Sequence, residues 1–514
     1  MYLLGIDAGT HACKSVLYNL SGKMIAQGYG EYTLSYPKAN WVVFDPERFW
    51  HSTAESMRDC LRNVNPNDVG AVGVASQAET AILINGEGRH VYPAISWLDQ
   101  RAESQREWLS ENFGRYEIYK ITGQPLHSMF TINKLMWLRE NEPRILEKAK
   151  KVLSVEDYII FKLSGNYATD QSIASRTMMF DVMRRRWSKE LLDLAGIAEE
   201  SLPNVYPSGT IVGEVHTKAS KETSLKKGTI VTTGGHDHPC GALAVGIIRK
   251  GPMLDSIGTS ESVMVSIDKP ILTKEVCDHG FSCYCSTLEG KYVVLGGLRT
   301  AGAVLTWFRD QLGEYETGKA VKGKKSAYNV LMEEAEKSQP GASGLLLLPH
   351  FMGSSMIHSD ARSKGAILGL TLSHKKADII RAILEGVSFE IRSNIASLEE
   401  LAKTKVTELR CIGGGTRSML WLKIRANITG RRVVLSDAPE ATSLGASICA
   451  GIGAGVYRDA YDAIKKVYRV KRVVESKKNM TRLYDKYYRV YETLYPALRE
   501  ISWRLDDIVA RGGK

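Results

Sequence analysis

The sequence has no segment that could cross a membrane as a helix, because no apolar run approaches the roughly 20 residues that a bilayer requires. The apolar run at residues 1–6 is too short for a signal peptide, and no basic residue precedes it. Cysteine is scarce: eight in 514 residues do not make the disulfide framework of a secreted protein. These absences predict a soluble, cytoplasmic protein without a membrane partner.

The charge also lacks the pattern of a nucleic-acid-binding surface. The formal net charge is +11, but the basic residues are scattered and are not interleaved with aromatic residues. We therefore expect no nucleic-acid partner, whereas an anionic ligand such as a nucleotide is compatible with the positive excess. A chain of 514 residues is too long for one compact core, so two large lobes or three smaller ones are expected.

Two parts of the chain open in the same way. A short strand at 2–6 runs into Asp7 and is followed by a second apolar run and a tight turn, which predicts a β-meander. A strand and a Gly-Thr turn recur at 252–259, so we expect one fold to be present twice, with a boundary at 246–251. Apolar periodicity predicts helices at 46–61, 101–113, 132–141, 145–163, 189–195 and 479–511.

The ends of two predicted strands carry candidate phosphate-binding loops. In Asp7-x-Gly9-Thr10, the glycine allows backbone N–H groups to approach a phosphate, and the carboxylate could hold Mg²⁺ through water. Lys14 follows and could face the phosphates. Gly258-Thr259-Ser260 is the second candidate. Each motif also occurs in ordinary turns, but one loop for each lobe suggests a nucleotide bound between the lobes.

A third glycine-rich segment lies at 413–418, between a predicted strand and a predicted helix. Its glycines could let a nucleoside lie against the backbone. A simple glycine-rich turn is the alternative interpretation.

The segment Gly234-Gly235-His236-Asp237-His238 follows a predicted strand at 229–233. A carboxylate at a strand end could act as a general base. The two flanking histidines also make a metal-hydrolase site an alternative interpretation. Such a site would require the strand to continue, so that both histidines share one face. We expect the two glycines to end the strand before this run.

Polar and aromatic side chains that suit a polyhydroxylated substrate follow two further predicted strands. Gln77 and Glu79 lie in the first segment, and Trp97 and Asp99 in the second. An aromatic face suits C–H groups, while carboxylates and amides suit hydroxyls. A structural ion network is the alternative interpretation.

Taken in order, these segments resemble the FGGY carbohydrate kinases, the family of glycerol kinase, xylulokinase and gluconokinase. The resemblance extends almost from end to end. It rests on residues 6–10 with Lys14, W-x-D-x-R-A at 97–102, G-G-x-D at 234–237, 258–260, G-x-x-T-A-G-x-x-L-x-W-F-R-D at 297–310, 349–373, 413–418, 440–446 and 494–499.

The resemblance implies an α/β fold of two actin-like, ribonuclease H-like lobes with mixed sheets flanked by helices. ATP and substrate would lie in the interlobe cleft. Residues 1–248 would form the lobe with the substrate and the first phosphate loop. Residues 249–514 would form the ATP-binding lobe, including a C-terminal helical segment from about 456.

The implied reaction moves the γ-phosphoryl group of ATP to a primary hydroxyl of a small sugar or polyol, with Mg²⁺ and with a xylulose-like ketopentose as the favoured substrate. Asp237 would be the catalytic base. The implied substrate contacts are Gln77, Glu79, Trp97, Asp99 and Asp237. The implied ATP contacts are Gly9, Thr10, His11, Lys14, Gly258, Thr259, Gly302, Gly414, Gly415 and Ser418. Asp7 would hold Mg²⁺ through water, and Asp237 is a second candidate ligand.

Two departures from the family pattern leave the substrate open. His11 stands where many members carry Thr or Ser, and Gln77-Ala78-Glu79 is neither the Gln-Met-His of xylulokinases nor the Gln-Arg-Glu of glycerol kinases. A kinase for glycerol or another short polyol is one alternative. Others are a non-catalytic actin-like nucleotide sensor or scaffold and a metal-dependent hydrolase. The resemblance also allows a homodimer.

Overall fold

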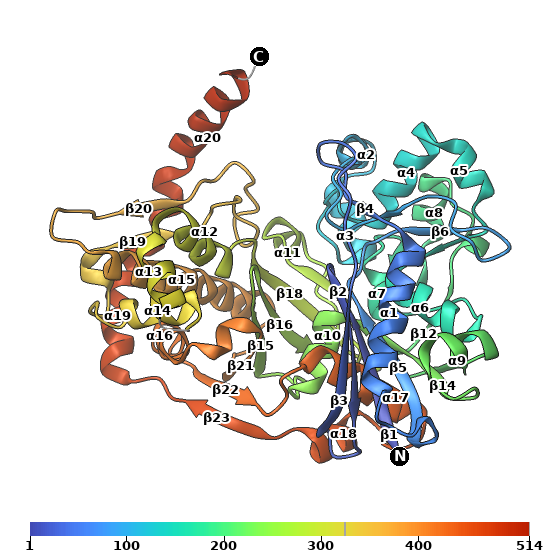
Figure 1. The fold of residues 1–514 in the computed structure, drawn as a ribbon. Coiled ribbons are helices and arrows are strands. Elements are labelled where there is room, and N and C mark those ends of the chain that lie inside the picture. Colours follow the sequence, from blue (N-terminus) through green and yellow to red (C-terminus); the bar gives the residue numbers. More distant parts are fainter. Residues whose placement is uncertain (323–324, 513–514) are drawn as a thin grey trace.

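Two β-sheets organise the molecule, each flanked by helices, in a computed structural model that describes residues 1–322 and 325–512 (Figure 1). The first sheet has the strand order β13-β14-β5-β1-β2-β3. Its strands are β1 (Tyr2–Ala8), β2 (Ala12–Tyr18), β3 (Met24–Glu31), β5 (Val69–Ser76), β13 (Ile211–Glu214) and β14 (Ile230–His236). We call the part built around this sheet the first lobe.

The second sheet has seven strands in the order β17-β18-β16-β15-β21-β22-β23 and forms the centre of the second lobe. Its strands are β15 (Pro252–Ile257), β16 (Glu261–Ile267), β17 (Ser282–Cys285), β18 (Tyr292–Leu298), β21 (Glu408–Ile412), β22 (Arg432–Ser436) and β23 (Val470–Val474).

The two sheets share one pattern of connections. In the first, β1 pairs antiparallel with β2 and parallel with β5, and β5 pairs parallel with β14. In the second, β15 pairs antiparallel with β16 and parallel with β21, and β21 pairs parallel with β22. An antiparallel strand follows at each outer edge, β13 and β23, and β17 is an addition to the second sheet. The expected repetition of one fold is confirmed, as is the two-lobed α/β class.

Parallel pairing brings the candidate site residues together. Strands β1, β5 and β14 are neighbours and run in the same direction, so their carboxyl ends lie at one edge of the first sheet. Ligands of open α/β sheets bind at this edge. Strands β15 and β21 place their carboxyl ends side by side in the second sheet in the same way.

One helix from the second half of the chain packs on the first sheet. A Cβ on Gly5 would lie 1.8 Å from the carbonyl oxygen of Ser443 in α17 (Ala441–Gly453), and one on Gly73 would lie 2.2 Å from that of Ala446. The absence of a side chain therefore allows α17 to lie directly against β1 and β5. Because α17 lies beyond residue 248 in the sequence but packs on the first sheet, the division at residue 248 stays a prediction.

Most predicted helices have close counterparts, including α1 (Pro46–Leu61), α2 (Glu103–Asn112), α4 (Thr131–Asn141) and α8 (Lys189–Ala195). The single helix predicted at 145–163 is wrong. The chain forms α5 (Pro143–Lys148), then β8 (Lys151–Leu153), then α6 (Val155–Ser164). The break has two causes: β8 pairs with β6 (Ile82–Ile84), and Ser154 with Asp157 forms a capping box that begins a new helix.

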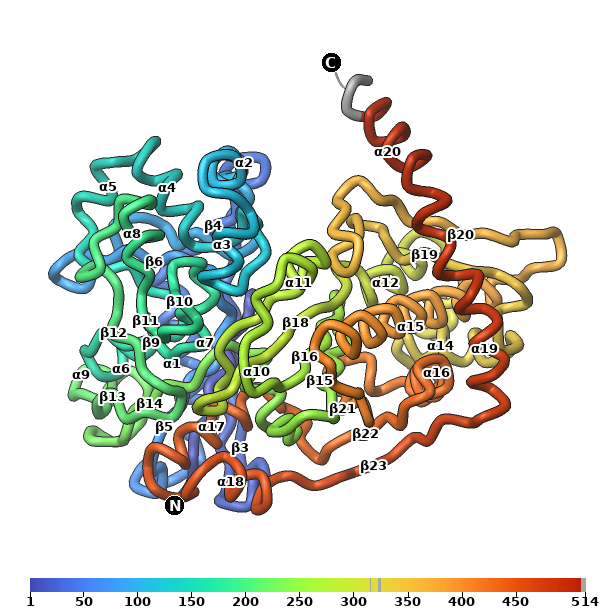
Figure 2. The backbone as a smooth tube through the Cα atoms, turned by 180° about the vertical axis from the view of Figure 1, so that it is seen from behind, coloured from blue at the N-terminus to red at the C-terminus, as the bar shows by residue number. Residues whose placement is uncertain are grey.

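The predicted C-terminal helix is also two helices, α19 (Lys478–Tyr491) and α20 (Leu494–Gly512). Helix α19 packs on α15 (Lys376–Leu401), where Tyr484 donates to Glu385 at 2.6 Å and Tyr491 to Glu390 at 2.6 Å. Helix α20 extends away from the body (Figures 1 and 2). Across the described residues, no helix combines the length and the apolar character needed to span a membrane.

Candidate active site

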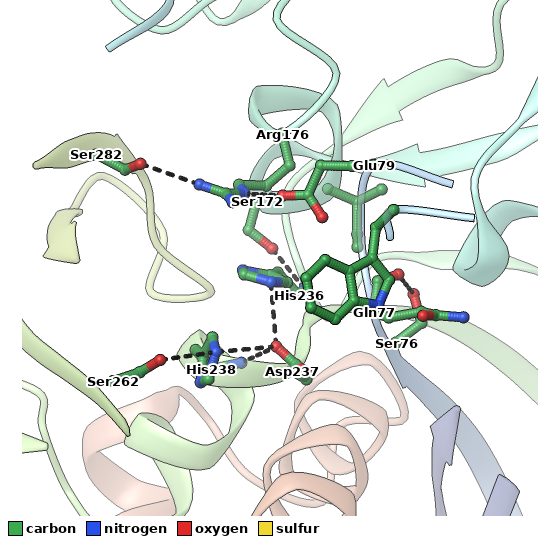
Figure 3. Close-up of polar contacts among 12 residues, drawn as sticks. Ser76, Gln77, Glu79, Ser172, Arg176, His236, Asp237, His238, Ser262 and Ser282 are labelled. Atoms are coloured by element: carbon green, nitrogen blue, oxygen red, sulfur yellow. Dashed lines mark hydrogen bonds and ion pairs between the residues drawn. The ribbon is translucent and has the colours of Figure 1, made fainter. Parts of the chain in front are cut away.

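The candidate site lies where the ends of β1, β5 and β14 meet. Asp7 is the second-last residue of β1, Gln77 and Glu79 follow β5, and Asp237 follows β14. Figure 3 shows the side chains around Asp237, with Arg176 and Ser282 on one side and His238 and Ser262 on the other. Ser262 and Ser282 belong to β16 and β17, so residues of both lobes contribute.

Asp237 begins a helix directly after the strand. Strand β14 continues through Gly234 and Gly235 to His236, so the expectation that the glycines end the strand is wrong. Gly235 has φ = +144°, and a Cβ on Gly234 would lie 2.2 Å from the carbonyl oxygen of Val74, so glycine is required at both positions. Helix α10 (Asp237–Ala244) then turns Asp237 toward the site.

Both histidines contact Asp237 but do not share one face, because His236 ends the strand and His238 lies in the helix. The Nε2 atom of His236 lies 3.0 Å from Oδ1 of Asp237, and that of His238 lies 3.9 Å from the same oxygen. The backbone N–H of His238 donates to this oxygen at 2.6 Å. The arrangement surrounds a carboxylate with donors and does not present two ligands to a metal.

The surroundings keep Asp237 ionised. Burial raises the pKa of its carboxyl, but His238, His236 and the His238 N–H more than offset burial, so the pKa lies below its ordinary value. The pKa of His236 is lowered to about 3, chiefly by burial, so its imidazole is neutral. The result is a negative oxygen beside a neutral ring, suited to accepting a proton.

Asp7 is a carboxylate without a partner: its side chain makes no hydrogen bond or ion pair to any residue that the structure describes. Burial, and next the nearby charge of Asp237, raise its pKa to about 7. A hydrated divalent cation would relieve both effects, so the expected role of Asp7 beside Mg²⁺ fits the geometry.

Glu79 is buried in a charged cluster. It has φ = +61°, and its carboxylate pairs with Arg176, whose Nε lies 2.5 Å away. Lys134, fully buried in α4, donates to the carbonyl oxygen of Glu79 at 2.7 Å. Arg176 also donates to Gln124 at 2.8 Å and, across the lobes, to Ser282 at 3.1 Å. Glu79 is thus held at the site edge by Arg176 at its carboxylate and by Lys134 at its backbone carbonyl oxygen.

Gln77 and Trp97 connect the substrate wall to the first phosphate loop. The amide nitrogen of Gln77 donates to the hydroxyl of Tyr32 at 3.1 Å, and Tyr32 donates to the carbonyl oxygen of Gly9 at 2.8 Å. The indole N–H of Trp97 donates to the hydroxyl of Thr10 at 3.0 Å. The amide oxygen of Gln77 is buried and finds no donor among the described residues, so it can accept from a ligand.

Asp99 lies elsewhere than at the substrate-facing surface that the sequence predicted. Its side chain has no exposed area, and both carboxylate oxygens accept from Arg101 at 2.8 Å. One of them also accepts from the N–H of Val42 at 2.6 Å. Arg101 in turn stacks on Trp41, 3.8 Å from the ring centroid. The alternative of a structural ion network therefore describes Asp99, which supports the wall from behind.

The first phosphate loop leaves donors free. Gly9 donates to the carbonyl oxygen of Ala12, but the N–H groups of Thr10 and His11 make no hydrogen bond within the described chain. The ring of His11 is exposed. Lys14 projects from β2 and pairs with Glu440 at the start of α17, with its Nζ 2.9 Å from the carboxylate. Free N–H groups and a lysine at one loop fit a phosphate.

The second phosphate loop, residues 258–260, is exposed and packs on the start of α12 (Gly302–Leu312). Gly302 donates to the carbonyl oxygen of Gly258 at 3.0 Å, and a Cβ on Gly302 would lie 2.6 Å from that oxygen. The N–H of Thr259 has no acceptor in the described chain. Buried Arg425 contacts Glu261, directly after the loop, at 2.5 Å and 3.0 Å.

The third glycine segment divides into packed and open positions. A Cβ on Gly415 would lie 2.3 Å from Cγ2 of Ile257, whereas one on Gly414 would meet nothing within 4 Å. Gly414 is exposed, so a flat ligand has room beside its backbone. The hydroxyl of Ser418 accepts from the N–H of Trp421 and caps α16 (Met419–Thr429).

Sequence reasoning did not find Arg176, Lys134, Tyr284 or Arg425. Each is a single residue on an element far along the chain from its partner, without a surrounding motif. Their common signal is a charged or polar residue inside an apolar segment, as for Lys134 among buried residues of α4 and Arg425 among those of α16.

Comparison with known proteins gives one consistent result. The family model "FGGY family of carbohydrate kinases, N-terminal domain" matches residues 2–244, and the model for the C-terminal domain of the same family matches residues 253–454. A gluconokinase of Bacillus subtilis is 29% identical over 511 residues, which is 98% of this chain and 96% of that protein. A glycerol kinase of Thermococcus gammatolerans is 30% identical over 482 residues, 92% of this chain and 93% of that protein.

A solved structure agrees with these matches. The xylulose kinase of Rhodospirillum rubrum superposes with a TM-score of 0.88 at 26% identity and covers 98% of this chain and 100% of its own. The similarity therefore extends over both lobes and includes relatives named for three different substrates.

Proposed function

The chain belongs to the FGGY family of carbohydrate kinases, and we propose that it phosphorylates a primary hydroxyl of a ketopentose resembling xylulose, with Asp237 as the base. It is a kinase of sugars or polyols that uses ATP as the phosphate donor. The observation that carries the proposed mechanism is the position of Asp237: an ionised carboxylate at the carboxyl edge of the first sheet, beside residues of the second lobe.

In this proposal, ATP lies between the lobes. The free N–H groups of Thr10 and Thr259 donate to its phosphates from the two loops, and the nucleoside lies against Gly414. Asp7 would hold Mg²⁺, which would supply positive charge at the phosphates. Lys14 adds a second positive charge near the first loop, shared with Glu440.

The chemical step follows from the free oxygen of Asp237. The substrate hydroxyl donates its proton to Oδ2 of Asp237 as its oxygen forms a bond to the γ-phosphorus. The bond between that phosphorus and the bridging oxygen breaks, and the electron pair leaves with ADP. Positioning and charge neutralisation supply most of the catalysis in such transfers.

A ketopentose suits the groups available near Asp237. The amide oxygen of Gln77 and the amide nitrogen of Gln124 are buried without partners in the described chain, so one acceptor and one donor are available for hydroxyls. Trp97 offers an indole face for C–H groups. Ala78 stands where glycerol kinases carry arginine, so a contact that this arginine would make with glycerol is missing here.

Release of ADP tests the proposal with a panel of xylulose, ribulose, gluconate, glycerol and aldopentoses. We expect kcat/KM to be highest for a ketopentose. If gluconate or glycerol gives the highest value, the kinase assignment stands and the substrate proposal is overturned. If no member of the panel stimulates ADP release, the non-catalytic sensor becomes the better interpretation.

A further inference from the structure

A line of close polar contacts reaches Asp237 from the second lobe through His236. The hydroxyl of Tyr284, on β17, lies 2.9 Å from Nδ1 of His236. The other ring nitrogen lies 3.0 Å from Oδ1 of Asp237. The backbone of His236 is itself held, because its N–H donates to Ser172 at 2.8 Å. Tyr284 and Asp237 belong to different lobes, and one buried imidazole joins them.

Chemistry favours one arrangement of the protons along these contacts. A neutral imidazole carries one N–H. With that N–H on Nε2, the ring brings a positive edge to Oδ1 of Asp237, 3.0 Å away, and leaves the lone pair of Nδ1 for the hydroxyl of Tyr284. Tyr284 then donates to Nδ1, and burial, which raises the pKa of its hydroxyl, keeps its proton in place.

Two nitrogens therefore lie against the same oxygen of Asp237. Oδ1 accepts from the backbone N–H of His238 at 2.6 Å and lies 3.0 Å from Nε2 of His236. Oδ2 has no hydrogen-bond or ion-pair partner in the described chain and is the oxygen left for a substrate. Rotation of the carboxylate would break the close contact with His236 as well as the hydrogen bond from the His238 N–H, so the ring helps to set which oxygen points outward.

We propose that His236 and Tyr284 are positioning residues, which set the orientation of Asp237 for proton transfer only when the second lobe is in place. This inference rests on the proposed role of Asp237. Because Tyr284 comes from the second lobe, separation of the lobes removes the donor that fixes the His236 tautomer. The base is therefore aligned only when both lobes enclose the substrates. This dependence limits transfer of the phosphoryl group to water.

Other polar groups near Asp237 do not replace this line of contacts. His238 approaches the same oxygen only at 3.9 Å, and its ring is 3.3 Å from the hydroxyl of Ser262. The remaining charged and titratable groups facing Asp237 from neighbouring elements are Asp7 in β1, Glu79 after β5, Arg176 after α7 (Gln171–Ser175) and Tyr284 in β17. None of them is within hydrogen-bonding distance of Oδ1.

Three variants test the proposal by steady-state kinetics. Tyr284→Phe keeps the ring and removes the donor, so we expect kcat to fall by about tenfold or more, the size of one lost hydrogen bond in a charged network, with the KM for ATP unchanged. The kcat of His236→Leu should fall at least as far. His236→Gln retains an N–H that can reach Asp237 and should recover part of the lost turnover.

Tyr292→Phe is the matched control. Tyr292 lies on the neighbouring strand β18, and its hydroxyl also donates across the lobes, to the carbonyl oxygen of Val182 at 3.2 Å, but it does not contact His236. We expect near-normal kcat for this variant. Equal losses in Tyr284→Phe and Tyr292→Phe would show a general effect of interlobe contacts and would overturn the positioning role.

The outcomes also separate this inference from the proposed base. If Asp237→Asn is nearly inactive while Tyr284→Phe and His236→Leu keep wild-type kcat, the base stands and the positioning role is wrong. If Asp237→Asn itself keeps wild-type kcat, the base assignment is wrong, and the positioning role that rests on it is wrong as well. If His236→Leu does not fold, Tyr284→Phe still tests the positioning role, because this variant loses only a hydroxyl and should fold.

Discussion

Asp99 and Asp237 show how differently two carboxylates can be used within one lobe. Both follow a predicted strand, and the sequence pattern placed both at the substrate. Asp99 is neutralised by Arg101 in a site with no exposed area, whereas Asp237 faces neutral or distant partners and keeps a free oxygen. The difference lies in the partners: Arg101, two residues from Asp99 in the same motif, binds both oxygens of Asp99, whereas Oδ2 of Asp237 has no such partner among the described residues.

Removal of Asp99 should therefore reduce stability and leave sugar recognition largely unchanged. In Asp99→Ala, the buried guanidinium of Arg101 loses its counter-charge, which should lower the free energy of unfolding by about 3–5 kcal/mol. Thermal denaturation and the sugar KM of the folded protein measure the two effects. Glu103→Ala is the control, because it breaks the exposed pair with Arg106 and should change little. A large rise in sugar KM without loss of stability would contradict this placement.

At the scale of elements, glycines decide which loops pack tightly and which can receive a ligand. Gly302 and Gly415 lie directly against neighbouring groups, whereas Gly414 faces open space. The sequence identified all three as ATP contacts, since a glycine that fits a phosphate and a glycine that fits a packed chain look the same. The structure separates them by what a Cβ would meet.

Gly414→Val tests the nucleoside position. The new side chain has room in the free protein, so the thermal midpoint should not change. It would occupy the space proposed for the nucleoside, so the KM for ATP should rise at least about fivefold, equal to about 1 kcal/mol. Gly415→Val should instead lower the thermal midpoint, because of its 2.3 Å approach to Ile257. An unchanged KM for ATP in Gly414→Val would place the nucleoside elsewhere.

Strands and helices whose apolar residues repeat with one regular spacing could be predicted from the sequence. Segments that divide into several short elements could not. Helix α1 was predicted to the residue and the meander in its order of strands, because apolar spacing and turns agree there. The segment at 145–163 was not, since β8 exists only through its pairing with β6, a partner some 70 residues earlier. The same limit hid Tyr284 and Arg176, whose roles depend on contacts between distant elements.

At the scale of the molecule, two copies of one topology hold the two phosphate loops on separate lobes. Contacts between the lobes include Tyr284 with His236 and Arg176 with Ser282, and α17, from the second half of the chain, packs on the first sheet. The proposed ATP site needs groups from each lobe at once, so the bound state should favour a closer approach of the two.

Substrate together with a nonhydrolysable ATP analogue should therefore compact the protein. Small-angle scattering should show a smaller radius of gyration with both ligands than with either alone, because only both together contact every loop. The Asp237→Asn variant should compact in the same way, since it loses proton transfer and not binding. An unchanged scattering profile would count against closure.

Turnover of Asp237→Asn tests the central claim most directly. Asparagine keeps the size and polarity of the side chain but cannot accept the proton, so kcat should fall by about 10²–10⁴-fold. Folding and nucleotide affinity, measured on the same sample, should remain those of the wild type. A variant that folds, binds nucleotide and turns over at the wild-type rate would show that Asp237 is not the base.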